Sequence, residues 1–133
     1  MRNFIFSETQ MVYMQGYKIV RTPVQIPVPG NKLIEEYIGR VQTGDEKVSV
    51  AHMIAPPEWG EPEQCPTFDE MTIMIRGKMN IKIGDEEVIL NAGEVILTEA
   101  GTTVQYSNPF KEENEYWAIC MPAFSPESAN RKS

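Results

Sequence analysis

The stretch Gly93–Asn108, which reads GEVILTEAGTTVQYSN, decides the fold. Glycine stands at positions 93 and 101 and asparagine at 108, and they bound two short runs that are apolar or alternating. Such runs between glycine and asparagine turns are typical of β-strands. We therefore predict a buried strand at 95–97, a turn at Gly101 and a second strand at 104–107.

The chain from residue 33 to residue 121 repeats this pattern. Met79–Ile83 alternates strictly between apolar and polar residues, which predicts a strand with one buried face. Gly84-Asp85 predicts a hairpin turn into a return strand at 87–90. Many short strands separated by turns indicate a β-sandwich or barrel, so the predicted fold class is all-β. Further strands are predicted at 33–38, 48–54, 71–75 and 116–121.

Composition limits the kinds of partner. The chain has 133 residues and a formal net charge of −7, with no run of basic residues, so we expect one domain and no nucleic-acid surface. No apolar run approaches the roughly 18 residues of a membrane span, and no secretory signal pattern is visible at the N-terminus. Cys65 and Cys120 lack a metal or redox spacing and are expected to be free thiols. We expect a cytoplasmic protein that does not act at a membrane.

Two segments flank the strand-rich region. Residues 1–32 contain three prolines, which lack the backbone donor that a sheet interior needs, so we interpret them as an extended N-terminal arm with added edge strands. Residues 33–122 form the predicted barrel. Residues 123–133 are mostly polar, and we expect this tail to fray.

Five framework positions resemble the cupin superfamily. Glu70 and Gly77 have the spacing of the second half of the first cupin motif, and Gly93, Gly101 and Asn108 have that of the second motif. The resemblance implies a single-domain double-stranded β-helix, that is, a jelly-roll barrel. The stretches 61–70, 100–109 and 120–126 are also similar to a group of small single-domain bacterial cupins of the RmlC-like type, a likeness that implies no particular reaction.

The metal ligands that the family uses are mostly absent from the sequence. Cupins typically hold a divalent metal with three histidines and one glutamate, but the histidine of the second motif is replaced by Val104. The two histidines of the first motif fall on Gln64 and Pro66, or on Glu63 and Cys65 with a longer spacer. Because only the glutamate matches, we expect no metal and no cofactor.

One atypical metal site stays open as an alternative. Glu63, Cys65 and Glu70 supply carboxylate and thiolate groups, and His52 lies on a neighbouring predicted strand. Side chains of these types bind zinc and related ions. The sequence does not say whether the fold brings the four together.

Strand parity predicts which residues face the barrel interior. If Glu70 points inward, Thr72 shares its face, and if Val104 points inward, so does Tyr106. The last strand offers either Tyr116, Ala118 and Cys120 or Trp117, Ile119 and Met121, and parity alone does not choose between them. The predicted ligand-binding residues are Gln64, Thr72, Val104, Tyr106, Trp59 and His52, with Glu70 as the candidate catalytic residue.

Glu70 has two interpretations. In an apolar cavity without a metal its pKa would rise, and it would be suited to act as a general acid or base. Alternatively, it forms an ion pair with a cation such as Arg40 or Arg76 and stabilises the barrel.

These observations support one main hypothesis and two alternatives. The main hypothesis is a cupin that lacks the histidine metal site and binds a small molecule near Glu70. The alternatives are a metal-independent isomerase, epimerase or cyclase that uses Glu70 as acid or base, and a metal enzyme with unusual ligands. The resemblance also implies a homodimer, with residues 20–30 as one contact.

Overall fold

The computed structural model describes residues 4–6, 11–14 and 16–132, with side chains from residue 16 onward. The described part of the chain is almost entirely β-structure, as predicted, and no helix in it is long and apolar enough to span a membrane. The elements are β1 (Phe4–Phe6), β2 (Met11–Met14), β3 (Tyr17–Val20), β4 (Val24–Gln25), β5 (Leu33–Ile38), β6 (Ser49–Ala55), β7 (Trp59–Gly60), β8 (Asp69–Arg76), β9 (Lys78–Ile83), β10 (Glu86–Asn91), β11 (Val95–Thr98), β12 (Val104–Asn108), β13 (Asn114–Met121) and α1 (Pro126–Ala129).

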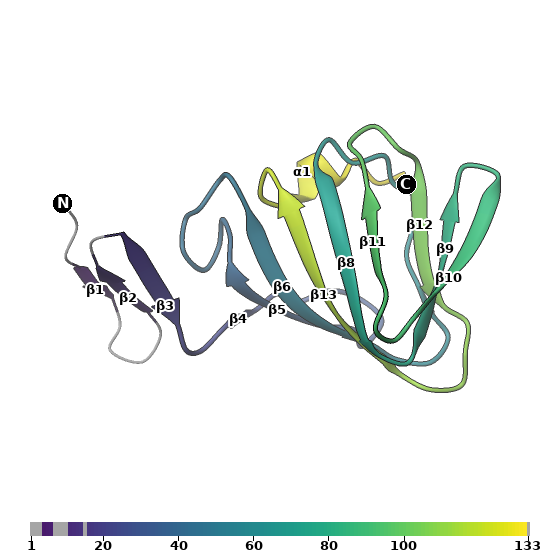
Figure 1. Cartoon of the computed structure of the whole chain (residues 1–133), viewed down its shortest axis with the longest axis horizontal. Coiled ribbons are helices and arrows are strands. Elements are labelled where there is room, and N and C mark those ends of the chain that lie inside the picture. Colours follow the sequence, from purple (N-terminus) through teal and green to yellow (C-terminus); the bar gives the residue numbers. More distant parts are fainter. Residues whose placement is uncertain (1–3, 7–10, 15, 133) are drawn as a thin grey trace.

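Two antiparallel sheets form the jelly-roll barrel (Figure 1). One sheet has six strands in the order β11-β8-β13-β6-β5-β4, and the other has four in the order β10-β9-β12-β7. Non-consecutive strands are neighbours in both sheets, which is the crossover pattern of a jelly roll. Side chains from both sheets meet in one core, which includes Met74, Met79, Ile81, Val104 and Tyr106.

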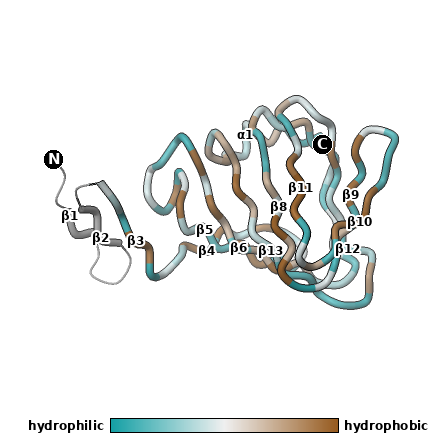
Figure 2. The backbone as a smooth tube through the Cα atoms, in the orientation of Figure 1, coloured by the Kyte–Doolittle hydropathy of each residue, from teal (hydrophilic) through white to brown (hydrophobic). Residues whose placement is uncertain are grey.

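The strand at 95–97 exists as β11, but it is not buried as predicted. Val95 and Leu97 are 57% and 58% exposed, while Ile96 packs against the core and Thr98 is buried. Side chains alternate along β11, so Val95 and Leu97 point to the outer face of the sheet, which is open to solvent, while Ile96 and Thr98 point inward. Figure 2 shows that β8 and β11, which are neighbours in this sheet, both carry many hydrophobic residues.

The described strands of the N-terminal arm pair with other strands of the same chain. β1, β2 and β3 form a separate three-stranded sheet at one end of the molecule (Figure 1). The arm also contributes β4, which pairs with β5 at the edge of the six-stranded sheet. The homodimer in which residues 20–30 form a contact stays a prediction. Residues 1–3, 7–10 and 15 of the arm lie outside the described residues.

The C-terminal tail does not fray as predicted, at least as far as residue 132. Ser125 caps α1: its side chain accepts a hydrogen bond from the backbone N–H of Ser128, and the Ser128 hydroxyl completes the capping box. Ala129 is fully buried, and the backbone N–H of Lys132 donates to the carbonyl of Glu63. A serine in place of the usual glutamate in the box, within a polar segment, hid this helix from sequence reasoning.

Asn108, the last residue of the opening stretch, joins three loops. Its side-chain amide donates to the carbonyls of Ala55, Pro56 and Glu112 at 3.2, 3.1 and 2.9 Å, and its Oδ1 accepts from the backbone N–H of Phe110. The residue is fully buried. Without its side chain, the three carbonyls and the N–H group would each lose a hydrogen-bond partner in a place that water does not reach. The asparagine of the motif is therefore a structural residue.

We expect Asn108→Ala to lower the free energy of unfolding by about 2–4 kcal/mol, because it leaves buried carbonyls without a donor. Urea denaturation of purified protein measures the change. Asn91→Ala, at an exposed position at the end of β10, is the matched control and should change stability by less than about 0.5 kcal/mol. Equal losses in the two variants would contradict the structural role.

Candidate functional site

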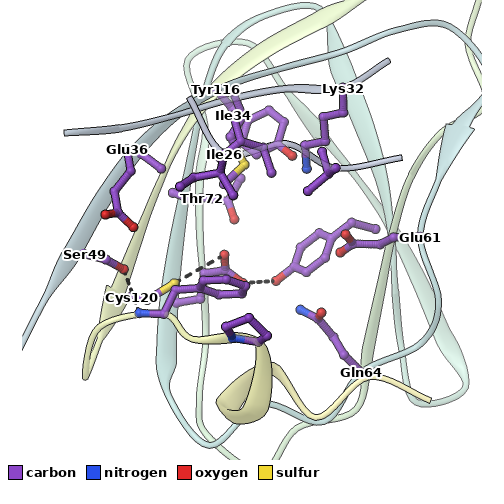
Figure 3. A pocket seen from close by; sticks show the side chains of 18 of the residues that line it. Ile26, Lys32, Ile34, Glu36, Ser49, Glu61, Gln64, Thr72, Tyr116 and Cys120 are labelled. Carbon is purple, nitrogen blue, oxygen red and sulfur yellow. Dashed lines mark hydrogen bonds between the residues drawn. The ribbon is translucent and has the colours of Figure 1, made fainter. Parts of the chain in front are cut away.

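A cavity of about 270 Å³ lies inside the barrel (Figure 3). Its wall on the six-stranded sheet is set by register, because cross-strand neighbours on one face of a sheet lie in rows. Cys120 lies opposite Glu70 on β8 and opposite Ser49 on β6. The inward rows are Ser49-Cys120-Glu70, Glu36-Ala51-Ala118-Thr72 and Ile34-Met53-Tyr116-Met74. The last strand therefore turns Tyr116, Ala118 and Cys120 inward, which settles the parity that the sequence left open.

Glu70 is the centre of a hydrogen-bonded group. The hydroxyl of Tyr106 donates to Glu70 Oε1 at 3.0 Å, and the thiol of Cys120 lies 3.7 Å from Oε2 as a donor. Tyr106 comes from β12 in the other sheet, so the carboxyl group bridges the two sheets. Both oxygens of Glu70 thus have a neutral donor, and both donors line the cavity.

The environment of Glu70 favours its protonated form. Burial raises the pKa of its carboxyl group and the negative charge of Glu61 adds to this, while hydrogen bonds from Tyr106 and Cys120 and the charge of Lys32 oppose it. Burial also raises the pKa values of Tyr106 and Cys120, so that hydroxyl and thiol are donors at neutral pH. A carboxyl group with a raised pKa in a cavity can hold or transfer a proton near neutral pH.

A second polar group lies across the cavity. Arg131, in the C-terminal tail, donates from Nε to Gln64 Oε1 at 3.2 Å, and its Nη2 lies 3.6 Å from a carboxylate oxygen of Glu61. The amine of Lys32 also points into the cavity from just before β5. Sequence reasoning missed Lys32, Glu61 and Arg131, because none lies in a motif and two lie in segments interpreted as an arm and a frayed tail.

The remaining wall is apolar and comes partly from the two flanking segments. Ile26 and Val28 of the arm and Phe124 of the tail line the cavity together with Met53 and Phe68. The arm and tail therefore complete the cavity.

Four of the predicted site residues line the cavity, namely Gln64, Thr72, Tyr106 and Glu70. Val104 and Trp59 instead belong to the hydrophobic core, where they are 1% and 8% exposed. Val104 is held there because its backbone pairs with Gln64 in both directions, at 2.8 Å.

His52 does not line the cavity. Side chains alternate along β6, so Ala51 and Met53 face inward and His52 faces outward. Its Nδ1 lies 2.9 Å from a carboxylate oxygen of Glu35 and its Nε2 lies 2.7 Å from one of Glu115. Partial burial alone would lower the histidine pKa, but these two hydrogen bonds outweigh it and raise the pKa.

The atypical metal set is not assembled either. His52 is on the outer face of the sheet, and Glu63 forms an ion pair of 2.6 Å with Lys132. Within the described part of the chain, no group of three or more His, Cys, Asp and Glu side chains could hold a metal ion.

The expected ion pairs of Glu70 with Arg40 or Arg76 are wrong. Arg40 pairs with Glu46 at 3.3 Å, and Arg76 pairs with Glu113 at 3.0 Å on the outside of the barrel. Arg76 has the same parity as Glu70 along β8, but the pairing of β8 with β13 shifts register between Glu115 and Tyr116, so Arg76 lies opposite Glu115. Arg40 lies in the turn that follows β5.

We expect Glu70→Gln to raise the melting temperature relative to wild type at neutral pH but not near pH 4. In wild type the folded state holds a proton that the unfolded chain releases above the ordinary glutamate pKa of 4.5, so stability falls as pH rises from there toward the raised pKa. Thermal unfolding across pH measures the difference. The exposed Glu87→Gln should show no such trend, and a flat difference for Glu70→Gln as well would contradict a raised pKa.

We expect His52→Gln to destabilise the fold by about 1 kcal/mol at about pH 5.5 and by less at about pH 9. A histidine pKa that is raised on folding contributes stability below about 6.5, and this contribution is lost as pH rises through the folded value. Denaturant titrations at the two pH values measure it. A larger loss at the higher pH would contradict the assignment.

Comparison with known proteins agrees with this architecture. A family model described as the cupin domain matches residues 51–120. The endoribonuclease YbeY of Myxococcus xanthus (strain DK1622) is 41% identical over 108 residues, which are 81% of this chain and 37% of that protein. The chain thus spans little more than a third of that relative.

Solved structures with the same architecture share little sequence with the chain. An RmlC-like cupin of Methanocaldococcus jannaschii has a TM-score of 0.62 at 16% identity, over 75% of this chain and 90% of that one. KdgF of a Halomonas species has a TM-score of 0.64 at 11% identity, over 76% and 89%. A variant of the oxalate decarboxylase of Bacillus subtilis has 0.68 at 18%, over 82% and 30%. These likenesses show the fold alone, and together with the family model they confirm the resemblance seen in the motifs: the chain belongs to the cupin domain family.

Proposed function

We propose that the chain binds a small organic molecule in the barrel cavity, in contact with Glu70. The observation that carries this proposal is a largely apolar cavity with a hydrogen-bonded carboxyl group at its centre. Small-molecule sites in proteins are usually concave and mainly apolar, with a few converging polar groups. The cavity has this composition: Glu70, Tyr106 and Cys120 form one polar group, Glu61, Gln64 and Arg131 form a second, and most of the remaining wall is apolar.

The residues at the usual histidine positions support binding without a histidine metal site. Gln64 is engaged with Arg131, and Val104 is part of the core. Neither side chain is therefore placed to take over the metal-binding role of a histidine. We propose that the polar group around Glu70 takes over the recognition of the ligand.

A second candidate function is acid–base catalysis without a metal, of the isomerase, epimerase or cyclase type. The raised pKa of Glu70 favours it, because a carboxyl group with a raised pKa keeps its proton to higher pH than an ordinary glutamate and can donate it to a substrate. Tyr106 and Cys120 remain neutral donors and would orient the carboxyl group.

We expect a substitution that fills the cavity to abolish ligand binding. Ala118 is 2% exposed and lines the cavity, so Ala118→Phe places a ring where the ligand would lie. A thermal-shift screen of a metabolite library with wild type identifies ligands, since one present at about 100 times its dissociation constant stabilises the fold by about 2.7 kcal/mol. The matched control is Ile119→Phe, which alters the opposite face of the same strand.

The screen separates binding in the cavity from binding elsewhere. Shifts that vanish in Ala118→Phe but persist in Ile119→Phe support the proposal, provided that circular dichroism shows both variants folded. Should Ala118→Phe fail to fold, Thr72→Val, which removes a cavity hydroxyl at nearly constant volume, is expected to weaken binding instead. Shifts that persist in every cavity variant would contradict binding in the barrel.

We expect Glu70→Gln to abolish conversion of any ligand that wild type turns over, while binding is retained. Loss of a general acid or base typically costs about 10²–10⁴-fold in rate. Product analysis by mass spectrometry with each hit of the screen measures it. Unchanged turnover in Glu70→Gln would rule out the acid–base role and leave the binding function in place.

A further inference from the structure

Lys32 is a half-buried cation at the cavity wall whose charge no neighbouring carboxylate pairs with directly. Its Nζ lies 4.0 Å from the ring centroid of Trp59 and 5.1 Å from that of Tyr116, and the described residues give it no ion pair. An ammonium group is attracted to an aromatic face, which holds it in place without neutralising it. Figure 3 shows the nitrogen directed into the cavity.

The charged groups that face Lys32 already have other partners. Glu61 lies within 3.6 Å of Arg131, and Glu70 accepts hydrogen bonds from Tyr106 and Cys120. These two carboxyl groups and Arg131 act on Lys32 only at a distance: Glu61 and Glu70 favour its charged form, and Arg131 opposes it. Burial nevertheless dominates and lowers the lysine pKa to about 8.

An ammonium group in this position lacks a counter-ion. Taking a charge out of water costs free energy unless another charge or several hydrogen bonds replace the water. A bound anion beside Lys32 would restore that balance. The cavity wall also carries the carboxyl groups of Glu36, Glu61 and Glu70, but each has other partners. Glu36 accepts from the backbone N–H groups of Val41 and Gln42, Glu61 pairs with Arg131, and Glu70 accepts from Tyr106 and Cys120. Among the described residues of the wall, Lys32 is therefore the cation without a direct anionic partner.

The apolar lining and the volume of the cavity indicate what kind of ligand body it can hold. Ile26 and Ile34 lie on the side of Lys32 (Figure 3), and Val28, Met53, Phe68 and Phe124 also line the apolar wall. At about 30 Å³ for each water, a cavity of about 270 Å³ holds roughly nine non-hydrogen atoms. A molecule of this size with one carboxylate and an aliphatic or aromatic body matches both surfaces.

We propose that Lys32 binds the carboxylate of the ligand, and that the ligands of this cavity are small monocarboxylic acids with an apolar body. This inference rests on the proposed binding function and names its substrate class. Glu70, which lines the same cavity, would then face the apolar body or a second polar group of the acid.

Matched acids and amides test the role of the charge. Hexanoate and benzoate are each compared with the corresponding amide, by calorimetry or ligand-observed NMR, at neutral pH. At least one of the acids should bind wild type tenfold or more tightly than its amide. Lys32→Met should remove that preference, while Lys111→Met, at an exposed loop position, should keep it.

The pH dependence identifies the cation. Affinity for the acid should fall about tenfold per pH unit above about pH 8 in wild type, because an unprotonated lysine has no charge to offer. Lys32→Arg stays charged at every pH used, so its affinity should not fall in this range. A merely structural role of Lys32 would not produce this difference between the two proteins.

Several results would overturn the inference. Equal binding of acids and amides by wild type, or an acid preference that survives in Lys32→Met, removes Lys32 from recognition and leaves the cavity's binding function untouched. Absence of acid binding at millimolar concentration also overturns it, and the library screen with Ala118→Phe then decides the proposed function separately. If Lys32→Met does not fold, the wild-type and Lys32→Arg pH profiles alone decide.

Discussion

The alternation of side chains across the six-stranded sheet is the constraint on which the site depends. Because β8, β13 and β6 pair in antiparallel register, Glu70, Cys120 and Ser49 form one transverse row on the inner face. A shift of one residue in any of these pairings would exchange that row for outward-facing residues. The position of the Glu70 carboxyl group in the cavity therefore depends on the pairing of the whole sheet as well as on its hydrogen bonds to Tyr106 and Cys120.

The strands and half of the site could be predicted because their signals are local. The alternation in 79–83 predicts a strand and Gly84-Asp85 predicts a turn without reference to the rest of the chain. Parity from Glu70 placed Thr72 in the cavity, and parity from Val104 placed Tyr106 there. Val104 also faces inward, but its assignment to the cavity was wrong, because an inward side chain in a barrel either lines the cavity or packs in the core. Which of the two applies depends on where along the barrel the residue lies relative to the cavity, and the sequence of a single strand does not give that position.

The rest of the site could not be predicted because it comes from segments with weak local signals. Lys32 precedes a strand and Arg131 follows a one-turn helix, and their approach depends on tertiary packing at separations of about a hundred residues in sequence. The assignment of His52 failed for a simpler reason: its strand was predicted correctly, but no inward anchor residue was available to fix the parity of β6. The register between β6 and β13 supplies that anchor, by pairing His52 with Trp117 and Ala51 with Ala118.

The two tryptophans divide between the two faces of the barrel wall. Trp59 lies beneath the ammonium group of Lys32, whereas Trp117 lies on the outer face with its ring centroid 5.1 Å from that of His52. Indole emission is sensitive to a nearby positive charge, so each ring carries its own optical signal: Trp59 for the interior and Trp117 for the protonation of the outer histidine. A protein with a single tryptophan left in place, at one position or the other, would thus report separately on events inside and outside the same sheet.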